Sequence, residues 1–336
     1  MPMRVAINGF GRIGRMILRA FSESSYKDIQ IVAINDLGSS LTNAHLFQYD
    51  SIHGRYKNSV EMCDNFMNIG LGLMEIFSEP SPENLPWSRL NIDLVFECSG
   101  RFTQKEQAMR HLQAGAKRVL ISAPGENADL TVVYGVNHHE LSSEHQILSN
   151  ASCTTNCLAP IVSVLHKALG IEYGYMTTIH SYTGDQRLVD TLHSDLRRAR
   201  AAALSMIPSS TGAAKAVGLV LPELKGKLDG TSIRVPTANV SVVDFKFHSK
   251  KPTHRDEINQ ALQEASQGSL KDILSTVNLP LVSCDFNHDP HSSIVDLPQT
   301  QVIEGRFCRI LSWYDNEWGF SNRMLDVANY MGRLNA

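Results

Sequence analysis

Short apolar runs alternate with helical stripes along the first part of the chain. Residues 4–7 and 29–34 are apolar runs of strand length, and each predicts a buried strand. The segment between them repeats its apolar residues at helical spacing, so it predicts a helix with one buried face. That face consists of Ile13, Ile17, Leu18 and Phe21.

The same alternation continues to about residue 150. Further strands are predicted at 92–98, 119–122 and 130–133, and a helix that ends at Gly115 separates the first two. Strands and helices that alternate in this way are typical of an α/β fold with a Rossmann-type, doubly wound sheet. Ligands of such sheets bind beyond the carboxyl ends of the strands. The candidate residues near these ends are Ser99, Phe102 and Ser122.

The pattern changes after a helix predicted at 158–168. Apolar and polar residues alternate at 243–248, which indicates an antiparallel strand with one wet face, and further strands are predicted at 282–286 and 307–314. Helical stripes cover 258–265 and 324–331. We therefore expect a second α+β domain with a mixed, largely antiparallel sheet. The expected boundaries are 1–150, 151–315 and 316–336, with the last segment forming a helix that returns to the first domain.

Composition narrows the class of protein. The 336 residues are enough for two domains, and the contents of 43% hydrophobic and 19% charged residues suit a globular protein. A net charge of −3 gives no electrostatic reason to expect nucleic acid or a membrane surface as a partner. Six cysteines are too few for a disulfide scaffold, and the N-terminus lacks the apolar region of a signal peptide. We expect free thiols and a cytoplasmic location.

A glycine motif lies between the first strand and the first helix. Gly9, Gly11 and Gly14 have the G-x-G-x-x-G spacing, and Asp36 ends the second strand about 20 residues later. Glycines let the backbone approach a pyrophosphate, and the helix N-terminus faces its negative charge. Asp36 can accept from both ribose hydroxyls and would repel a 2′-phosphate. The motif therefore predicts a dinucleotide site that takes NAD rather than NADP.

A run rich in hydroxyls and amides at 149–157 precedes the helical segment 158–168 and can open that helix near Cys153. Ser152 or Thr154 can cap this helix, and its dipole would stabilise a thiolate and lower the pKa of Cys153. The pattern thus indicates a cysteine nucleophile beside an anion site. A buried, unreactive cysteine is an equal alternative on this run alone. A zinc site with Cys157 is weaker, because no second ligand pair with metal spacing follows.

Two further polar segments lie in the second domain. The charged stretch at 184–203 is either a solvated loop or an ordered interface element. The segment 209–215 begins another helix with hydroxyl residues that can cap it. That helix start is a second natural anion site.

Five segments together resemble phosphorylating glyceraldehyde-3-phosphate dehydrogenases, and the resemblance extends over essentially the whole chain. The motifs around Cys153 and Thr211 are highly specific, whereas the glycine motif is shared with many dehydrogenases. The five segments are 6–15, 149–156, 195–200, 210–215 and 313–317.

The resemblance implies a role for each candidate side chain. The Cys153 thiolate attacks an aldehyde carbon, and His180 acts as general base and as an ion-pair partner of the thiolate. Oxidation leaves a thioester on Cys153, which inorganic phosphate then attacks. The residues implied for the substrate phosphate are Thr183, Arg198 and Arg234, and those for the attacking phosphate are Ser152, Thr154, Thr211 and Gly212.

The resemblance also implies how the cofactor and other subunits are held. NAD is the implied cofactor, and Asn316 would hold its nicotinamide carboxamide. The stretch after Tyr182 resembles a loop that reaches a neighbouring subunit's cofactor pocket, so a homotetramer is implied. The implied cofactor residues are Gly9, Gly11, Arg12, Ile13, Gly14, Asp36, Ser99, Phe102, Ser122 and Asn316.

A few positions depart from the commonest family pattern. Phe320 replaces a usual tyrosine near the nicotinamide, and Leu192 replaces a proline common in members that use NAD. The segments 234–240 and 290–292 resemble the sister family of erythrose-4-phosphate dehydrogenases. Oxidation of glyceraldehyde 3-phosphate to 1,3-bisphosphoglycerate, a step of glycolysis, is the expected function. The alternative is oxidation of erythrose 4-phosphate to 4-phosphoerythronate in pyridoxal phosphate biosynthesis.

Two other classes of protein explain fewer of these residues. A hydrolase that uses Cys153 and His180 would have no use for the glycine motif or for Asp36. A non-catalytic nucleotide-binding protein would not require a cysteine flanked by two sets of hydroxyl residues that suit phosphate. An NAD-dependent enzyme with a thioester intermediate uses both sets.

Overall fold

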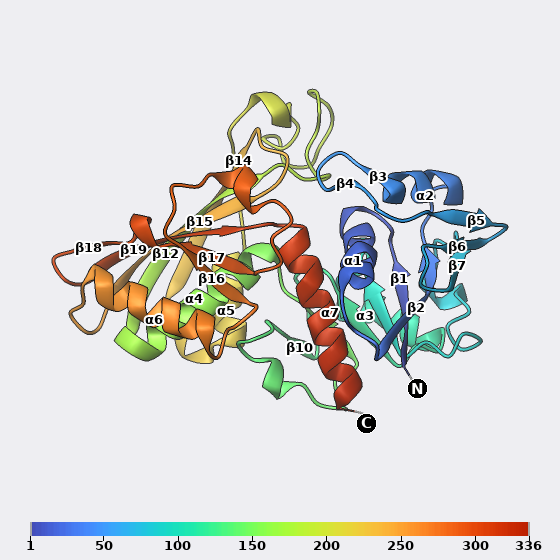
Figure 1. Ribbon diagram of the computed structural model, residues 1–336, viewed down its shortest axis with the longest axis horizontal. Helices are drawn as coiled ribbons and strands as arrows, with labels where there is room; N and C mark the ends of the chain where they lie inside the picture. The colour runs from blue at the N-terminus through green and yellow to red at the C-terminus, as the bar shows by residue number, and fades with distance from the viewer. Residues whose placement is uncertain (1, 335–336) are drawn as a thin grey trace. The chain divides into compact units, whose positions relative to one another are not determined.

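The computed structural model describes residues 2–334, which form two compact units (Figure 1). Unit 1 holds the described residues up to Val132, together with His138–Ser152 and the chain from Ser321 onward. Unit 2 holds Val133–Asn137 and Cys153–Phe320. The last helix, α7 (Trp318–Arg333), therefore begins in unit 2 and continues in unit 1. Within residues 2–334, none of the helices has the length and apolar character that a membrane crossing needs.

Unit 1 is built on a nine-stranded sheet in the order β10-β11-β9-β8-β1-β2-β7-β6-β5. Strands β10 to β7 of this order pair in parallel, and β5 and β6 form an antiparallel edge. The predicted doubly wound sheet is thereby confirmed. Its strands are β1 (Met3–Asn8), β2 (Ile29–Asn35), β5 (Glu61–Cys63), β6 (Phe66–Asn68), β7 (Leu73–Phe77), β8 (Leu94–Glu97), β9 (Arg118–Ile121), β10 (Leu130–Thr131) and β11 (Ile147–Ser149).

The central strand of unit 1 decides where a ligand can bind. Strand β1 has β2 on one side and β8 on the other, so successive strands leave it in opposite directions. Such a switch point opens a crevice at the carboxyl ends of the strands. The other elements of unit 1 are α1 (Arg12–Glu23), α2 (Ser40–Gln48), α3 (Lys105–Gln113), the ribbon of β3 (Tyr49–Asp50) and β4 (Gly54–Arg55), and the short turns η1 (Pro82–Asn84) and η2 (His138–Glu140).

Unit 2 is built on an eight-stranded mixed sheet, as predicted. Strand β12 pairs in parallel with β14 and antiparallel with β15, which in turn pairs antiparallel with β19. The alternation predicted at 243–248 belongs to β15. The strands are β12 (Ile171–Ser181), β13 (Ile207–Ser209), β14 (Leu228–Val235), β15 (Ser241–Ser249), β16 (Leu274–Val277), β17 (Ser293–Asp296), β18 (Gln301–Ile303) and β19 (Phe307–Tyr314).

One face of this sheet is covered by three helices: α4 (Cys153–Leu169), α5 (Ala213–Val220) and α6 (Arg255–Gln267) (Figure 1). Helix α4 begins at Cys153, which confirms the helix start predicted within the run 149–157. Its apolar side chains are fully buried, which anchors the helix and with it the position of its first residue. These side chains are Leu158, Ile161, Val162 and Leu165.

One predicted strand is wrong. The apolar run at 282–286 forms a short 3-10 turn, η5 (Ser283–Phe286), instead of a strand. The Asp285 carboxylate accepts a hydrogen bond from the Val282 N–H at 2.8 Å, and the Asp285 N–H donates to the Val282 carbonyl at 3.0 Å. These local bonds close the backbone on itself, so it cannot pair with a neighbouring strand.

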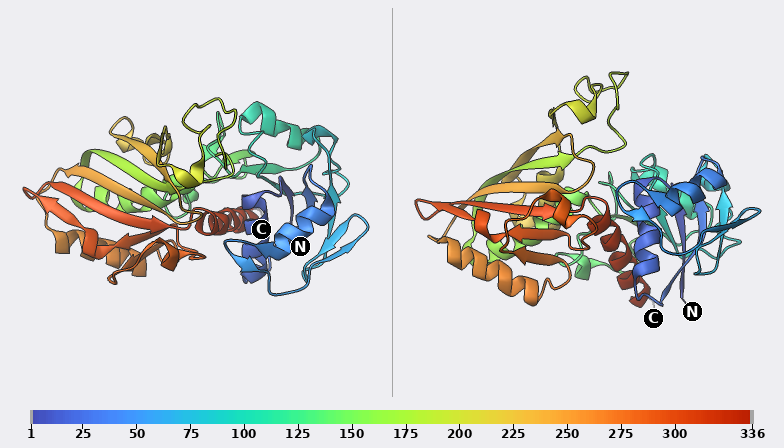
Figure 2. Two further views of the ribbon diagram at one scale, coloured as in Figure 1. Left: turned by 90° about the horizontal axis from the view of Figure 1, so that it is seen from above. Right: turned by 45° about the horizontal axis from the view of Figure 1, so that its top comes forward.

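The charged stretch of unit 2 is a long loop that stands away from the rest of the unit (Figure 2). Its own contacts hold it: the Arg200 guanidinium pairs with the Asp190 carboxylate at 2.7 Å, and the Thr191 N–H donates to the Ala199 carbonyl at 3.0 Å. Several leucines on the loop point to solvent, and Leu192 is 91% exposed. Apolar side chains exposed on an ordered loop favour an interface element over a solvated loop.

Candidate functional site

The glycine turn of unit 1 is shaped by close backbone approaches. Gly9 has a φ of +91°, and a Cβ there would lie 2.4 Å from the Ser99 nitrogen. A Cβ on Gly14 would lie 2.2 Å from the Gly9 carbonyl oxygen. Gly11 differs, because a Cβ there would have no atom of the described residues within 4 Å. Packing thus requires the outer glycines, and the middle one leaves open space at the start of α1.

A groove of about 250 Å³ lies over this turn. Five residues predicted for the cofactor line it, and Arg12 and Ile13 begin the adjoining α1. Ser122 does not line the groove; its N–H donates to the Glu97 carbonyl at 2.9 Å. The lining consists of Asn8, Gly9, Gly11, Asn35, Asp36, Leu37, Glu79, Pro80, Cys98, Ser99, Arg101 and Phe102.

Asp36 ties the glycine turn to the end of β2. One carboxylate oxygen accepts from the Phe10 N–H, and the other accepts from the Gly38 N–H, each at 2.8 Å. The following residue, Leu37, is 54% exposed and brings no positive charge to the groove. A carboxylate at this edge suits a ribose with free hydroxyls and disfavours a 2′-phosphate. The open space at Gly11 and this carboxylate therefore fit NAD.

The guanidinium of Arg12 is held within the protein. Both of its terminal nitrogens bond to the Asp50 carboxylate. Burial alone would raise the pKa of Asp50, but this bond and the backbone N–H groups of His53 and Ile52 lower it to about 2. Because the Arg12 side chain is paired with Asp50, the start of α1 would contact a ligand through its backbone N–H groups.

A buried carboxylate beneath the groove was missed at the sequence level. Glu97 is 1% exposed and accepts from the Asn8 side-chain amide at 2.5 Å, the Ser99 N–H at 2.8 Å and the His111 Nε2 at 2.9 Å. Trp87 donates to the His111 Nδ1 at 3.0 Å, which places the imidazole proton on Nε2. This network fixes the ends of β1 and β8. Its signal is a glutamate inside the apolar run 92–98.

In unit 2, Cys153 and His180 face one another. The Cys153 Sγ lies 3.5 Å from the His180 Nε2. Burial raises the pKa of the thiol, although the positive charge of Arg234 and the bonds from Thr154 oppose this. The prediction of a lowered thiol pKa is therefore wrong for the protein without ligand, because desolvation outweighs the helix dipole.

Burial also disfavours the charged form of His180. It is 4% exposed, and burial, followed by the charge of Arg234, lowers its pKa to about 3. Burial therefore opposes the thiolate–imidazolium ion pair that the resemblance implies. The His180 Nδ1 lies 2.7 Å from the Ser181 carbonyl oxygen and 2.6 Å from the Arg234 Nη1. When Nδ1 donates to that carbonyl, Nε2 is left free to take the thiol proton.

Positive charge gathers beside this pair. Arg234 lies opposite His180 in the register of β12 and β14, and its Nη1 donates to the Ser181 carbonyl at 3.0 Å. Its Nε has no hydrogen-bond partner among residues 2–334. Arg198 is held by Asp185 at 2.5 Å, close enough for its charge to help lower the pKa of Arg234, which burial lowers most. These guanidinium groups suit a phosphate.

Two helix N-termini of unit 2 are tied together next to Cys153. Thr155, in the first turn of α4, donates to the Ala213 carbonyl at the start of α5 at 3.2 Å. Gly212 is the N-cap of α5, and Thr211 accepts from the Ala213 N–H at 3.2 Å. The predicted cap is thus a glycine preceded by a threonine. Free N–H groups at two such ends favour a second anion.

Other predicted residues have less direct positions. The Thr154 hydroxyl bonds to the buried Tyr314 hydroxyl at 2.8 Å, and both the hydroxyl and the N–H of Thr154 bond to the Cys153 sulfur. Thr183 opens the charged loop, and its carbonyl accepts from the Gln186 N–H at 2.9 Å. Ser152 is the last residue before α4. Tyr314, which Thr178 also contacts at 2.9 Å, lies in the segment 313–317 but was not predicted as a site residue.

Asn316 follows the last strand of unit 2. It is 5% exposed, and its Oδ1 accepts from the Ser241 hydroxyl at 2.9 Å. The preceding Asp315 accepts from the N–H groups of Glu317 and Trp318, which fixes the start of α7. Phe320, which replaces the usual tyrosine, is buried in that helix.

The zinc alternative finds no support in the geometry. The Cys157 sulfur is buried, lies 3.7 Å from the Ser293 hydroxyl, and has its pKa raised to about 12 by burial. Among the described residues, no group of three His, Cys, Asp or Glu side chains is placed to hold a metal. Cys157 is a core residue.

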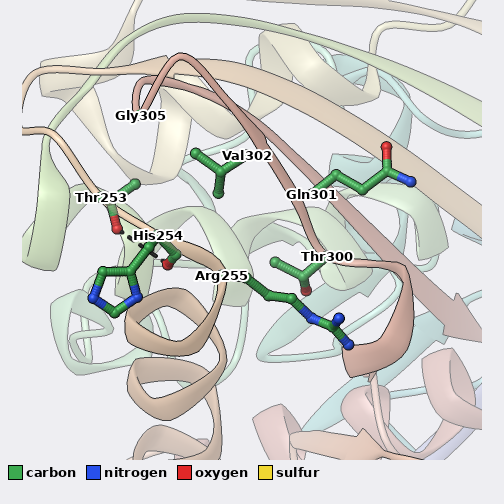
Figure 3. Close-up of a pocket in the computed structure, with 7 residues that line it drawn as sticks. All are labelled: Thr253, His254, Arg255, Thr300, Gln301, Val302 and Gly305. Carbon is green, nitrogen blue, oxygen red and sulfur yellow. Dashed lines mark hydrogen bonds between the residues drawn. The ribbon is translucent and has the colours of Figure 1, made fainter.

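Unit 2 has a pocket of about 480 Å³ at the start of α6 (Figure 3). None of the predicted site residues lines it. The helix start is already capped, since the His254 ring accepts from the Glu257 N–H at 3.3 Å and Thr253 donates to the Glu257 carboxylate at 2.8 Å. It is lined by Thr253, His254, Arg255, Thr300, Gln301, Val302 and Gly305.

Each of the two units contains a segment that matches a domain of a known protein family. Residues 3–105 match the NAD binding domain of glyceraldehyde 3-phosphate dehydrogenase, and residues 152–316 match its C-terminal domain. The glyceraldehyde-3-phosphate dehydrogenase of Xanthobacter flavus is 60% identical over 99% of this chain and 100% of its own length. Those of Cereibacter sphaeroides and Pseudomonas aeruginosa are 61% and 56% identical, over 99% and 98% of this chain and 100% and 98% of their own lengths.

Proposed function

The chain belongs to the glyceraldehyde-3-phosphate dehydrogenase family, and we propose that it converts glyceraldehyde 3-phosphate to 1,3-bisphosphoglycerate with NAD and inorganic phosphate. The observation that carries this proposal is the Cys153 sulfur at 3.5 Å from the His180 Nε2, with Arg234 beside both. A nucleophile, a base and a phosphate-binding cation at one place are the parts that the reaction requires.

The first step forms a covalent bond to Cys153. His180 takes the thiol proton on Nε2 while the sulfur attacks the aldehyde carbon, and it returns the proton to the former carbonyl oxygen. The product is a hemithioacetal. Burial disfavours charge on both the thiol and the imidazole, which favours transfer of the proton as the new bond forms. Arg234 and Arg198, with Thr183, hold the substrate phosphate and so fix the aldehyde over the sulfur.

The second step is an oxidation. His180 takes the hydroxyl proton of the hemithioacetal, and a thioester remains on Cys153. NAD, when bound, accepts the hydride that this oxidation removes. We assign its dinucleotide part to Gly9, Gly11, Arg12, Ile13, Gly14, Asp36, Ser99, Phe102 and Ser122, and its nicotinamide carboxamide to Asn316.

The third step releases the product. A phosphate oxygen attacks the thioester carbon, the carbon–sulfur bond breaks, and the sulfur takes back the proton from His180. We assign the attacking phosphate to Ser152, Thr154, Thr211 and Gly212, where the starts of α4 and α5 meet. Helix N-termini attract this anion without a bound cation.

Steady-state kinetics with two aldehydes test the substrate. We expect higher kcat/KM for glyceraldehyde 3-phosphate than for erythrose 4-phosphate, and reduction of NAD that depends on inorganic phosphate. A preference for erythrose 4-phosphate with little dependence on phosphate would instead assign the chain to the sister activity. Release of phosphate from the phosphoester of either substrate, without reduction of NAD, would favour a hydrolase, and NAD binding without turnover of either aldehyde would favour a non-catalytic protein.

We also propose a homotetramer in the cytoplasm. The exposed leucines of the charged loop, including Leu188, Leu192 and Leu196, support contact with another subunit. All six cysteines are unpaired, which suits a reducing compartment. Light scattering on the purified protein should give about four times the chain mass, and Leu192→Glu should lower it. A monomer with full activity would contradict the tetramer.

A further inference from the structure

A buried serine in unit 2 connects the neighbourhood of the proposed base, His180, with Asn316, the residue assigned to the nicotinamide. Ser241 begins β15 and is fully enclosed. Its Oγ lies 3.1 Å from the Ser181 nitrogen and 2.9 Å from the Asn316 Oδ1. Ser241 has no role in the proposed reaction, yet it contacts one residue next to the base and one assigned to the nicotinamide.

The direction of these hydrogen bonds follows from the donors. The Ser181 N–H can only donate, so the Ser241 oxygen accepts from it. The single Ser241 proton has no other acceptor among the described residues, and it points to Asn316. The Asn316 atom that faces Ser241 must therefore be its oxygen, and its NH2 group is turned away. The serine decides which of two nearly isosteric amide orientations Asn316 adopts.

The backbone of the same residue, Ser181, also holds the base His180 in place. The Ser181 carbonyl lies 2.7 Å from the His180 Nδ1 and accepts from Arg234 at 3.0 Å. Ser181 thus holds the His180 ring through its carbonyl and the Asn316 amide through its N–H and Ser241. The side chain of Ser181 is itself anchored, because it donates to the Val240 carbonyl at 2.7 Å.

We propose that Ser241 is a positioning residue that locks the Asn316 amide with its NH2 group directed to the oxygen of the nicotinamide carboxamide. This inference rests on the role proposed above for Asn316. Without the serine hydroxyl the amide can rotate by 180° and present its oxygen, which repels the carboxamide oxygen instead of bonding to it. Binding of the nicotinamide end then weakens, while binding of the rest of the dinucleotide does not.

The test compares dissociation constants for NAD and for ADP-ribose, which lacks the nicotinamide. Ser241→Ala should weaken NAD about tenfold, or about 1.4 kcal/mol, and leave ADP-ribose unchanged. Ser241→Thr keeps the hydroxyl and should restore NAD binding. Ser249→Ala is the matched control, because Ser249 is equally buried at the far end of β15 and donates to the Lys251 carbonyl at 2.7 Å. It should change neither constant.

A double-mutant cycle separates this inference from the role of Asn316. Asn316→Ala should weaken NAD, and adding Ser241→Ala to it should cause little further loss, because the serine acts through the asparagine. Equal losses of NAD and ADP-ribose in Ser241→Ala, or a full additive loss in the double variant, would overturn the inference alone. Unchanged NAD binding in Asn316→Ala would overturn the role of Asn316 and the inference with it.

Discussion

The helix starts of α1 and α4 both face a proposed anionic ligand, yet they are built in opposite ways. At α1 the side chains are absent: Gly9 and Gly14 allow backbone atoms to meet, and Gly11 leaves open space. At α4 the side chains crowd together, with Cys153 and His180 buried against Arg234. The start of α1 is suited to bind a ligand through exposed backbone N–H groups. The start of α4 is suited to transfer a proton between Cys153 and His180.

This difference has an electrostatic consequence. Partly exposed helix ends stabilise anions, as expected for a pyrophosphate at α1. At α4 the same dipole acts on a thiol that burial has removed from water, and burial raises the pKa of Cys153 despite the dipole and Arg234. Burial therefore works against the helix dipole at Cys153, and we propose that proton transfer to His180 generates the nucleophile.

Removal of the nucleophile should have the largest effect. Cys153→Ser should lower kcat by roughly 10⁴-fold or more, because a hydroxyl is far harder to deprotonate than a thiol. NAD affinity and melting temperature should stay near wild type. Cys157→Ala is the control on the same helix, and it should keep most of the activity, since Cys157 contacts Ser293 in the core. Substantial turnover in Cys153→Ser would remove Cys153 from the mechanism.

The glycine turn should respond differently at each position. Gly9→Ala and Gly14→Ala place a Cβ within 2.4 Å and 2.2 Å of backbone atoms, so each should cost several kcal/mol of unfolding free energy. Gly11→Ala should leave the melting temperature unchanged but weaken NAD about tenfold or more, because its methyl occupies ligand space. Thermal melts with and without NAD separate the two effects. Equal melting temperatures for all three variants would contradict this account of the turn.

Arg234→Leu should change the pH dependence at α4. Its charge lowers the pKa of both Cys153 and His180, so its removal should raise both. Alkylation of Cys153 by iodoacetamide, which is uncharged, should then require higher pH than in the wild type. The kcat/KM should also fall about 10²-fold, from lost substrate phosphate binding. Arg309→Leu is a charge-matched control on β19. An alkylation profile that moves to lower pH would contradict the assignment.

Asp36→Ala should have the smallest effect of the set. Removing its carboxylate should reduce the preference for NAD over NADP about tenfold, since repulsion of the 2′-phosphate disappears. The variant also loses the bonds to Phe10 and Gly38, so NAD binding itself should weaken. Comparison of kcat/KM with both cofactors gives the result. An unchanged ratio would place the cofactor selectivity elsewhere in the groove.

The same comparison explains what the sequence could predict. Gly9 and Gly14 mark a backbone constraint that few other residues satisfy, so the turn, its strand and its helix were readable from spacing. The mixed sheet of unit 2 was readable from alternation in β15. The strand at 282–286 failed because a local bond from Val282 to Asp285 outweighs β propensity, and such a bond leaves no periodic signal.

The site was less readable than the fold. His180 is 27 residues from Cys153, and only the three-dimensional arrangement brings the two within 3.5 Å. The resemblance supplied the pair, but spacing does not encode the burial that disfavours charge on both groups. The roles of Glu97 and Ser241 were missed for the same reason, because each depends on hydrogen-bond partners that come from separate strands.

Trapping the acyl-enzyme tests the central claim most directly. The protein is mixed with NAD and glyceraldehyde 3-phosphate without inorganic phosphate, quenched in acid, digested and analysed by mass spectrometry. The account predicts a phosphoglyceroyl thioester on Cys153, at near one per chain, that disappears when phosphate is added before the quench. Formation of NADH with Cys153 unmodified, or an adduct on Cys157 instead, would contradict it.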